Sequence, residues 1–416
     1  MFGLLGKTLK HSFSKDIHES FTSKQYTLFE SDDLKEFFAN TPFIGLNVTI
    51  PYKNEVISYL DHLSPEAEAI QSVNTILRQG GKLYGYNTDY YGLAETLKQS
   101  GISVENQHVL ILGNGSTSRT IQYYCTKTLA KKITVLARNP KQNEHYFSDV
   151  ENYKSATIVF NSTPVGMFPD NDGHLPFQLN NLPDVVSVID VIYNPLRSNL
   201  LIEAEKRGLT TVNGLFMLIS QAVKAIEIFH NMKIPSVQVM SYYQSLRLKQ
   251  SNFVLIGMPM SGKSYFARRL SDLFTKELVE LDQAIEDYTG LSIPEIFSNQ
   301  GEESFRFIES QLISQYSKEH NKAISSGGGV ILNEDNMRRL KQNGIVIFID
   351  MPLAMLQECN PRSRPLLKDR KNLEILFHSR YDLYNAYADI VIQKTTYDGD
   401  LTMKQIEVKL HEYLNS

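Results

Sequence analysis

The sequence has few cysteines and no long run of apolar residues. The two cysteines, Cys125 and Cys359, form no C-x-x-C pair and no Cys/His cluster. This argues against a structural zinc site or a disulfide framework and fits a reducing compartment. No window reaches the roughly 18 apolar residues of a membrane span. The first residues, MFGLLGKTLKHSFSKDIH, also lack the apolar core of a signal peptide. We therefore expect a cytoplasmic protein without a membrane partner.

A strong charge of one sign is absent as well. The formal net charge is −4 and the sequence contains no long Lys/Arg run, which argues against a general nucleic-acid binder. At 416 residues the chain is too long for one ordinary domain, so two or three domains are expected.

What is present is an alternation of strand-like apolar runs with helical patterns. This alternation predicts an α/β fold with largely parallel sheets. The predicted strands include FGLLG, FIGLNVTI, HVLILG, KITVLA, ATIVFNS, VVSVIDVI, NFVLIG, KAISSGGGV and GIVIFID.

The turns divide the chain into three blocks. Residues 1–90 form one α/β block, which two predicted helices at 214–249 complete. Residues 91–213 form a second block, and residues 252–416 form a third. The junction at 248–252 has no Gly/Ser-rich or Pro-rich stretch, and such a short linker limits independent motion, so we expect the two halves to lie close together.

The second block begins with a glycine loop, VLILGNGSTSRT. Gly113 would allow a tight turn, and Gly115 would let the backbone approach a pyrophosphate at the N-terminus of the next helix. The following strand ends in Arg138, with Lys141 nearby; an Arg at this place suits the 2′-phosphate of NADP. Two alternatives remain open, because many strand-to-helix turns contain two glycines and Arg138 would also suit a solvated surface.

Small polar residues gather at predicted strand ends in the first block. In GLNVTIPYKNEV, Asn47 and Thr49 share one strand face, and Lys53 could transfer a proton if burial lowered its pKa. An exposed lysine in a first helical turn is the plain alternative for Lys53. Each of the other residues could be a turn residue or a cap, but together they suit a polyhydroxylated ligand. These others are Ser12, Ser14, Asn74, Asn87, Thr88 and Asp89.

The third block begins with FVLIGMPMSGKSYFARRL, which matches the P-loop pattern G-x-x-x-x-G-K-[ST]. A strand precedes the loop and a helix follows it, as the pattern requires. Backbone N–H groups of such a loop bind phosphates, Lys263 would reach the β and γ oxygens, and Ser264 would bind Mg²⁺.

Residues 1–250 contain, in this order, the motifs HSFS, GLNVTIPYK, SVNTI, GYNTD, LGNGS, NSTPVGM, DVIYNP and NGLFMLISQ. In content and order these motifs resemble shikimate dehydrogenase. The resemblance implies a substrate-binding domain, a Rossmann NADP-binding domain and NADPH-dependent reduction of 3-dehydroshikimate. Lys53 and Asp89 would be the catalytic pair. Shikimate would bind to Ser12, Ser14, Asn47, Thr49, Lys53, Asn74, Asp89, Tyr193 and Gln221. NADP would bind to Gly113, Asn114, Gly115, Ser116, Arg138, Lys141, Thr163, Met167 and Gly214.

In residues 252–416 the P-loop is followed by ELDQAIEDY, GEESFRFIE, ISSGGGVIL, RSRPLL and RYDLYNAYADIVI. In content and order these motifs resemble shikimate kinase. The resemblance implies transfer of phosphate from ATP to shikimate, with Asp282 as the catalytic residue. ATP would bind to Met260, Ser261, Gly262, Lys263, Ser264, Tyr265 and Arg364; shikimate to Asp282, Arg306, Gly328 and Arg380; and Mg²⁺ to Ser264, with Glu280 as a second candidate. Without the resemblance, Asp282 could be a helix N-cap, and Arg306 an ion-pair partner of Glu302 or Glu309.

The sequence departs from the two family patterns at several positions. Thr8 and Lys15 stand where proline is usual, Gln71-Ser72 replaces Gly-Ala, and Ser116 replaces a glycine. In the kinase part, Met260 replaces a glycine of the loop and Glu280 replaces an aspartate that assists Mg²⁺. We expect retained kinase activity with a changed metal preference.

The two resemblances together predict a bifunctional enzyme that makes shikimate and then phosphorylates it. We expect small-molecule substrates and no nucleic-acid partner. The sequence leaves the oligomeric state open and is compatible with a monomer. Three alternatives remain: a non-catalytic shikimate sensor, a first half that prefers quinate, and a chain with one inactive half. The joint presence of Lys53, Asp89, Lys263, Asp282 and Arg306 argues against the sensor.

Overall fold

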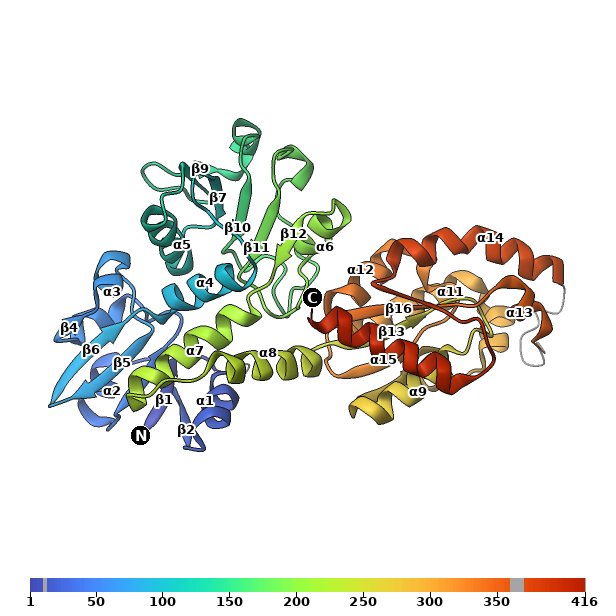
Figure 1. The fold of residues 1–416 in the computed structure, drawn as a ribbon, viewed down its shortest axis with the longest axis horizontal. Coiled ribbons are helices and arrows are strands. Elements are labelled where there is room, and N and C mark those ends of the chain that lie inside the picture. Colours follow the sequence, from blue (N-terminus) through green and yellow to red (C-terminus); the bar gives the residue numbers. More distant parts are fainter. Residues whose placement is uncertain (10–12, 360–369, 416) are drawn as a thin grey trace. The chain divides into compact units, whose positions relative to one another are not determined.

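The computed structural model describes residues 1–9, 13–359 and 370–415, and the chain forms two compact units (Figure 1). Unit 1 comprises Met1–Met167, Gly173–Tyr193 and Glu203–Tyr243. Unit 2 comprises Phe168–Asp172, Asn194–Ile202 and Gln244–Ser416.

The first sheet of unit 1 is mixed and has the strand order β2-β1-β3-β5-β6-β4. Strand β1 runs parallel to β2 and β3, whereas β5 runs antiparallel to β3 and β6. Helix α7 packs against α1 and α4. The strands are β1 (Phe2–Gly6), β2 (Tyr26–Glu30), β3 (Gly45–Val48), β4 (His62–Leu63), β5 (Thr75–Gln79) and β6 (Lys82–Tyr86). The helices are α1 (Ser14–Thr22), α2 (Leu34–Asn40), η1 (Glu55–Tyr59), α3 (Pro65–Ile70), α4 (Thr88–Gln99), α7 (Leu215–His230) and α8 (Ser236–Gln250).

The second sheet of unit 1 is parallel throughout, with the order β12-β11-β10-β7-β8-β9. Strand β7 is buried at every position, which explains the apolar run VLIL that follows His108. Because the chain leaves β7 toward β8 on one side and later returns as β10 on the other, the carboxyl ends of β7 and β10 border the crevice that binds ligands in doubly wound sheets. The elements are β7 (His108–Leu112), α5 (Ser116–Lys127), β8 (Lys132–Ala137), β9 (His145–Tyr146), η2 (Phe147–Tyr153), β10 (Ile158–Asn161), η3 (Leu179–Asn181), β11 (Ser187–Asp190), α6 (Asn199–Lys206) and β12 (Thr210–Val212).

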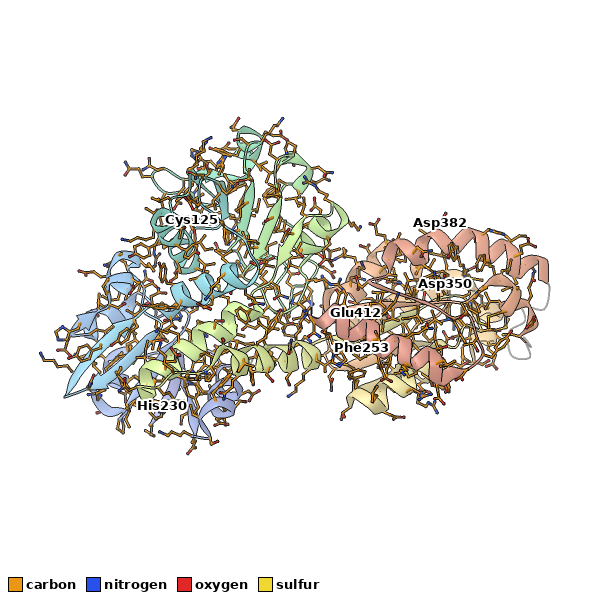
Figure 2. The ribbon with its side chains drawn as sticks, in the orientation of Figure 1. Cys125, His230, Phe253, Asp350, Asp382 and Glu412 are labelled. Atoms are coloured by element: carbon orange, nitrogen blue, oxygen red, sulfur yellow. The ribbon has the colours of Figure 1, made fainter. Side chains whose placement is uncertain are left out.

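Unit 2 is built on a parallel five-stranded sheet with the order β14-β15-β13-β16-β17. The central strand β13 is fully buried, and its Phe253 side chain belongs to the core (Figure 2). The strands are β13 (Asn252–Ile256), β14 (Glu277–Glu280), β15 (Lys322–Ser325), β16 (Gly344–Asp350) and β17 (Ile390–Gln393). The helices are α9 (Lys263–Phe274), α10 (Leu281–Thr289), α11 (Ile293–Tyr316), η4 (Val330–Leu332), α12 (Glu334–Asn343), α13 (Leu353–Glu358), α14 (Arg370–Tyr387) and α15 (Gly399–Asn415).

A buried ion pair holds one short stretch of unit 2 to its sheet. The Arg197 guanidinium donates to both carboxylate oxygens of Asp389, each at 3.0 Å. The Arg197 side chain is 11% exposed and that of Asp389 is 7% exposed. Lys341 Nζ lies 3.2 Å from the same carboxylate. Residues 194–202 are therefore bound to the edge of the sheet by charge-assisted hydrogen bonds.

The predicted fold class is confirmed: both units are α/β, with the strands named from the sequence in place. Within the described residues, no helix combines the length and apolar character that crossing a bilayer requires.

Candidate active sites

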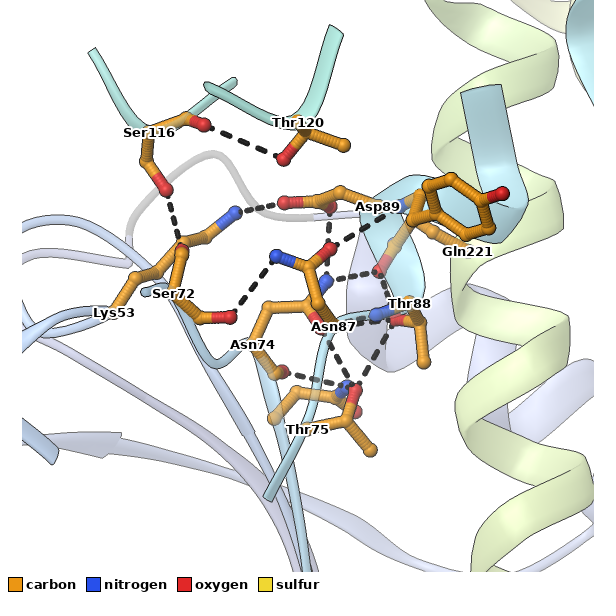
Figure 3. Close-up of polar contacts among 12 residues, drawn as sticks. Lys53, Ser72, Asn74, Thr75, Asn87, Thr88, Asp89, Ser116, Thr120 and Gln221 are labelled. Carbon is orange, nitrogen blue, oxygen red and sulfur yellow. Dashed lines mark hydrogen bonds and ion pairs between the residues drawn. The ribbon is translucent and has the colours of Figure 1, made fainter. Parts of the chain in front are cut away.

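The first candidate site centres on Lys53 and Asp89 (Figure 3). Lys53 follows β3, and Asp89 lies in the first turn of α4, where the Asn87 side chain caps the helix by accepting from Tyr90 N. Lys53 Nζ lies 2.6 Å from Asp89 Oδ2, and the two side chains are 16% and 11% exposed. A partly buried ammonium that is held by a carboxylate can donate a proton or stabilise an oxyanion.

Asn74 joins this pair to its surroundings. Its Nδ2 donates to Asp89 Oδ1 at 2.9 Å, and its Oδ1 accepts from the Thr88 backbone N at 2.7 Å. Gln221 on α7 brings its Oε1 within 3.5 Å of Asn74 Nδ2. The structure therefore brings Lys53, Asp89, Asn74 and Gln221 together from three separate parts of the sequence (Figure 3).

Asn47 lies beneath this cluster. It is 5% exposed, and its Oδ1 accepts from the Tyr26 hydroxyl at 2.7 Å. Its Nδ2 donates to Thr75 Oγ1 at 3.0 Å and to the Asn74 carbonyl at 3.2 Å. These bonds hold the backbone of Asn74 in place, so Asn47 supports the site from inside the protein.

Three other predicted substrate residues lie at element ends, and a fourth is not described. Thr49 directly follows β3 and is half-buried. Ser14 is the first residue of α1, next to Phe13, whose ring packs edge-on against Tyr193 at 5.8 Å. Burial raises the pKa of Tyr193, so its hydroxyl stays protonated and can donate a hydrogen bond. Ser12 lies outside the described residues.

The glycine loop follows β7 at the crevice of the second sheet. Gly113 has φ +96°, and a Cβ there would lie 3.0 Å from Ser162 Oγ, so this turn needs glycine. Gly115 is the N-cap of α5, and the space where its Cβ would point is open. The Asn114 side chain donates to Glu144 Oε2 at 2.7 Å, which holds the loop against the segment after β8.

The remaining predicted cofactor residues come after strands of the same sheet. Arg138 directly follows β8 and is exposed, as is Lys141. Thr163 lies two residues beyond Asn161, the last residue of β10, and is buried; both its N and its Oγ1 donate to Asn161 Oδ1. Met167 is 43% exposed. A Cβ on Gly214 would lie 2.0 Å from the Val191 carbonyl oxygen, so only glycine fits there.

These residues fit a bound dinucleotide. Open space at Gly115 and the N-terminus of α5, where a helix has N–H groups without intrahelical partners, suit a pyrophosphate. Arg138 supplies positive charge at the end of the neighbouring strand.

The second candidate site is the P-loop of unit 2. Gly262, with φ +99°, is the N-cap of α9, and Lys263 and Ser264 begin that helix. Lys263 is 6% exposed, and its Nζ donates to the carbonyls of Gly257 and Met258, each at 3.0 Å. Ser264 Oγ lies 3.1 Å from Ser325 Oγ at the end of β15. A buried lysine at a helix N-terminus suits binding of nucleotide phosphates.

A cavity opens beside this loop and includes both departures from the family pattern. Met260 has φ +72°, a conformation that favours glycine, and it packs partly against the hydrophobic core. The Glu280 carboxylate lies 3.6 Å from Arg268 and is half-buried. Among the described residues, no cluster of three or more His, Cys, Asp or Glu side chains could hold a metal. The cavity is lined by Met260, Gly262, Lys263, Ser264, Tyr265, Glu280, Asp282, Ser325 and Ser326.

Asp282 lies in the first turn of α10 and points toward the glycine segment after β15. A Cβ on Gly327 would lie 3.2 Å from both Asp282 Oδ1 and Glu309 Oε1. Burial raises the pKa of Glu309, although Arg306 opposes the shift. Arg306 Nη1 donates to Glu309 Oε2 at 2.8 Å. A Cβ on Gly329 would clash with the Arg306 guanidinium at 2.4 Å. The ion pairs that the sequence suggested are present, and they hold Arg306 against the glycine segment.

Arg380 on α14 reaches the same segment. Its Nη1 donates to the Gly328 carbonyl at 3.1 Å, and the Tyr384 hydroxyl donates to the same oxygen at 2.5 Å. Arg364 lies outside the described residues. The structure thus brings Asp282, Arg306, Gly328 and Arg380 to one edge of the sheet, where they could bind an anionic polyhydroxylated molecule.

Some residues of these sites were not named from the sequence. Tyr26 and Tyr384 are examples, because each acts through a hydrogen bond to a residue that is distant in the sequence, and no local pattern marks them.

Two family models match the chain. The model for the shikimate dehydrogenase substrate binding domain matches residues 4–76, and the model for shikimate kinase matches residues 259–410.

Several curated proteins named shikimate dehydrogenase (NADP(+)) are similar to the first part of the chain. The protein from Clostridium perfringens (strain SM101 / Type A) is 35% identical over 269 residues, which cover 60% of this chain and 99% of the relative. The protein from Methanococcus maripaludis (strain S2) is 33% identical over 266 residues, covering 58% and 95%.

Solved structures show the same likeness. A chorismate mutase/shikimate 5-dehydrogenase fusion protein from Clostridium acetobutylicum matches with a TM-score of 0.56 and 33% identity, covering 59% of this chain and 96% of the other. Shikimate dehydrogenase 1 from Peptoclostridium difficile matches with a TM-score of 0.54 and 34% identity, covering 59% and 97%.

Proposed function

Because the chain belongs to the shikimate dehydrogenase family and also carries a shikimate kinase domain, it is a bifunctional shikimate-pathway enzyme, and we propose that it catalyses two consecutive steps. The first part reduces 3-dehydroshikimate to shikimate with NADPH. The second part phosphorylates the 3-hydroxyl of shikimate with ATP and Mg²⁺. The observation that supports the proposal is that each part groups the residue types that its reaction needs: the Lys53–Asp89 ion pair in the first part, and the P-loop beside Asp282 in the second.

In the proposed dehydrogenase site, NADPH supplies a hydride to the C3 carbonyl when it is bound. The Lys53 ammonium, held by Asp89 at 2.6 Å, donates the proton that the developing alkoxide needs. Asn74 keeps Asp89 oriented. The substrate hydroxyls and carboxylate are bound by Ser12, Ser14, Thr49, Asn74, Tyr193 and Gln221, with Asn47 in support.

The proposed cofactor site follows the carboxyl ends of β7, β8 and β10. The N-terminus of α5 binds the pyrophosphate, and Arg138 reads the 2′-phosphate that separates NADP from NAD. The further residues of this site are Gly113, Asn114, Gly115, Ser116, Lys141, Thr163, Met167 and Gly214.

In the proposed kinase site, Lys263 and the N-terminus of α9 bind the ATP phosphates, Ser264 binds Mg²⁺, and Glu280 is a candidate second metal contact. Arg306 and Arg380 bind the shikimate carboxylate, and Asp282 orients the 3-hydroxyl for attack. Positioning of the two substrates supplies most of this catalysis, because phosphoryl transfer depends little on the strength of a catalytic base.

We assign residues 1–90 with 214–249 to substrate binding, 91–213 to the cofactor domain and 252–416 to the kinase. We propose the cytoplasm as its location.

Both cysteines are free thiols. Burial raises the pKa of the Cys125 thiol to about 12, so this thiol stays protonated and unreactive (Figure 2).

A one-pot assay tests the proposal. The purified chain is mixed with 3-dehydroshikimate, NADPH, ATP and Mg²⁺, and both loss of NADPH absorbance and formation of shikimate 3-phosphate are followed. Both signals are expected. NADPH loss with accumulation of shikimate would mean an inactive kinase, and binding of shikimate without either signal would favour a sensor.

A further inference from the structure

Two of the positions at which this sequence departs from its family pattern contact each other. Ser72 stands where Ala is usual and Ser116 where Gly is usual, and their hydroxyl oxygens lie 2.5 Å apart (Figure 3). Ser72 is fully buried. Ser116 is the first residue of α5, directly after the glycine loop. An Ala-Gly pair has no hydroxyl at either position, so the bond depends on both serines.

The backbone of Ser72 and of the next residue, Val73, is hydrogen-bonded to the segments that carry Asp89 and Lys53. The Ser72 carbonyl oxygen accepts from Asn87 Nδ2 at 3.0 Å, and Asn87 caps the helix whose first turn bears Asp89. The next backbone N–H, that of Val73, donates to the Lys53 carbonyl at 2.7 Å. The Ser116 hydroxyl is therefore one hydrogen bond away from the backbone that places the proton donor.

A second contact lies along the same helix. Arg119 Nε donates to the Ile70 carbonyl at 3.1 Å, and its Nη2 donates to Asn54 Oδ1 at 2.9 Å. The N-terminal turn of α5 is thus held to residues 70–72 at two points, Ser116 and Arg119.

We propose that Ser72 and Ser116 are positioning residues for hydride transfer. Their hydrogen bond sets the distance between the helix end that receives the cofactor pyrophosphate and the backbone that carries Lys53 and Asp89. Because a bound cofactor would be held at that helix end, the bond would govern how Lys53 and Asp89 are placed relative to it. Because a misplacement of even about 1 Å slows a reaction of this kind greatly, one such bond is enough to affect turnover. The inference rests on the roles proposed above for Lys53, Asp89 and the glycine loop.

The test is a double-mutant cycle in the full chain with Ser72→Ala, Ser116→Ala and the double variant. Each single change is expected to lower kcat for 3-dehydroshikimate reduction about three- to tenfold, the range for one neutral hydrogen bond. The KM for 3-dehydroshikimate should stay unchanged because the substrate residues are untouched. The double variant should be no slower than the slower single, since both changes remove the same bond.

Two matched variants serve as controls. Ser116→Thr keeps a hydroxyl and should restore kcat. Thr126→Ala removes an exposed hydroxyl that donates to the Gln122 carbonyl on the same helix, and it should leave kcat unchanged. The kinase rate, measured on every sample, should also stay unchanged.

Additive losses in the double variant, or singles with wild-type kcat, would overturn the proposal. A wild-type chain that does not oxidise NADPH with 3-dehydroshikimate would instead refute the proposed function. In that case the midpoint of thermal unfolding is measured for the same set of variants. If the effects of the two single changes on this midpoint add up in the double variant, the two hydroxyls do not interact and the proposal is also overturned.

Discussion

Lys53 Nζ and Asp89 Oδ2 lie 2.6 Å apart although 36 residues separate them in the sequence. The pairing of β3 with β5, and of β5 with β6, brings the two side chains together. Asn74, directly before β5, completes the arrangement by donating to the same carboxylate. Asn74 holds one oxygen of the Asp89 carboxylate and Lys53 contacts the other. The Lys53 ammonium is therefore the group of this cluster that can donate to a substrate oxygen.

Lys53→Ala should abolish hydride transfer and spare the kinase. Loss of a positioned proton donor typically costs about a hundredfold or more in rate. The measurement is NADPH oxidation with 3-dehydroshikimate, followed by the kinase assay on the same sample. Lys35→Ala, an exposed lysine of α2, is the control and should keep both rates. Loss of both activities in folded Lys53→Ala protein would contradict two separate sites.

Arg138→Asp should shift the cofactor preference from NADPH toward NADH. Hydrogen bonds to a charged group contribute about 1.5–3 kcal/mol, so the ratio of kcat/KM values should change by about ten- to a hundredfold. Lys131→Asp makes the same charge change at an exposed position before β8 and should leave the ratio unchanged. An unaltered NADPH preference in Arg138→Asp would mean that this guanidinium does not read the 2′-phosphate.

The sequence predicted those parts of the molecule that local patterns determine. After one polar residue each, the fully buried strands β7 and β13 are runs of four apolar residues. The P-loop is marked by the fixed spacing of Gly262, Lys263 and Ser264. These features depend on residues that are neighbours in the chain, so one sequence is enough to find them.

What the sequence could not provide is the partner of each polar group. Ser72 and Ser116 are 44 residues apart, and nothing local signals that they meet. Likewise, Arg197 lies within residues 91–213, the range predicted for the cofactor domain. Its side chain nevertheless binds Asp389, which directly precedes β17 and lies 192 residues later in the sequence. Such contacts depend on how elements pack, and a hydrogen-bonding side chain has many equally suitable partners until the packing is known.

Lys263→Ala should abolish phosphorylation of shikimate while dehydrogenase activity persists. Lys263 is buried at the start of α9, where its charge would stabilise the phosphates during transfer. Removing such a group costs about a hundredfold or more. Lys404→Ala, at an exposed position of α15, is the matched control. Kinase turnover that survives Lys263→Ala would show that the loop does not bind ATP in the proposed way.

Asp389→Asn should destabilise unit 2. The change leaves the Arg197 guanidinium buried without its carboxylate, and removing one partner of a buried pair costs about 3–5 kcal/mol. Hydrogen exchange of peptides from β17 measures the local free energy of unfolding. Asp400→Asn removes the carboxylate from the exposed Arg269–Asp400 pair and should give no measurable change. Equal protection in wild type and Asp389→Asn would mean that the pair contributes nothing net.

The same pair predicts how the stability of unit 2 depends on pH. Burial alone would raise the pKa of Asp389, but Arg197 and Lys341 outweigh it, so the pKa lies below its ordinary value of 3.8. A carboxyl whose pKa is lower in the folded state stabilises the fold fully above the unfolded value and loses that contribution as pH falls through the folded value. The difference in unfolding free energy between wild type and Asp389→Asn should therefore be constant near neutral pH and shrink below about pH 4. A difference that instead shrinks between pH 7 and pH 5 would place the titration on another group, because Asp389 stays ionised throughout that range.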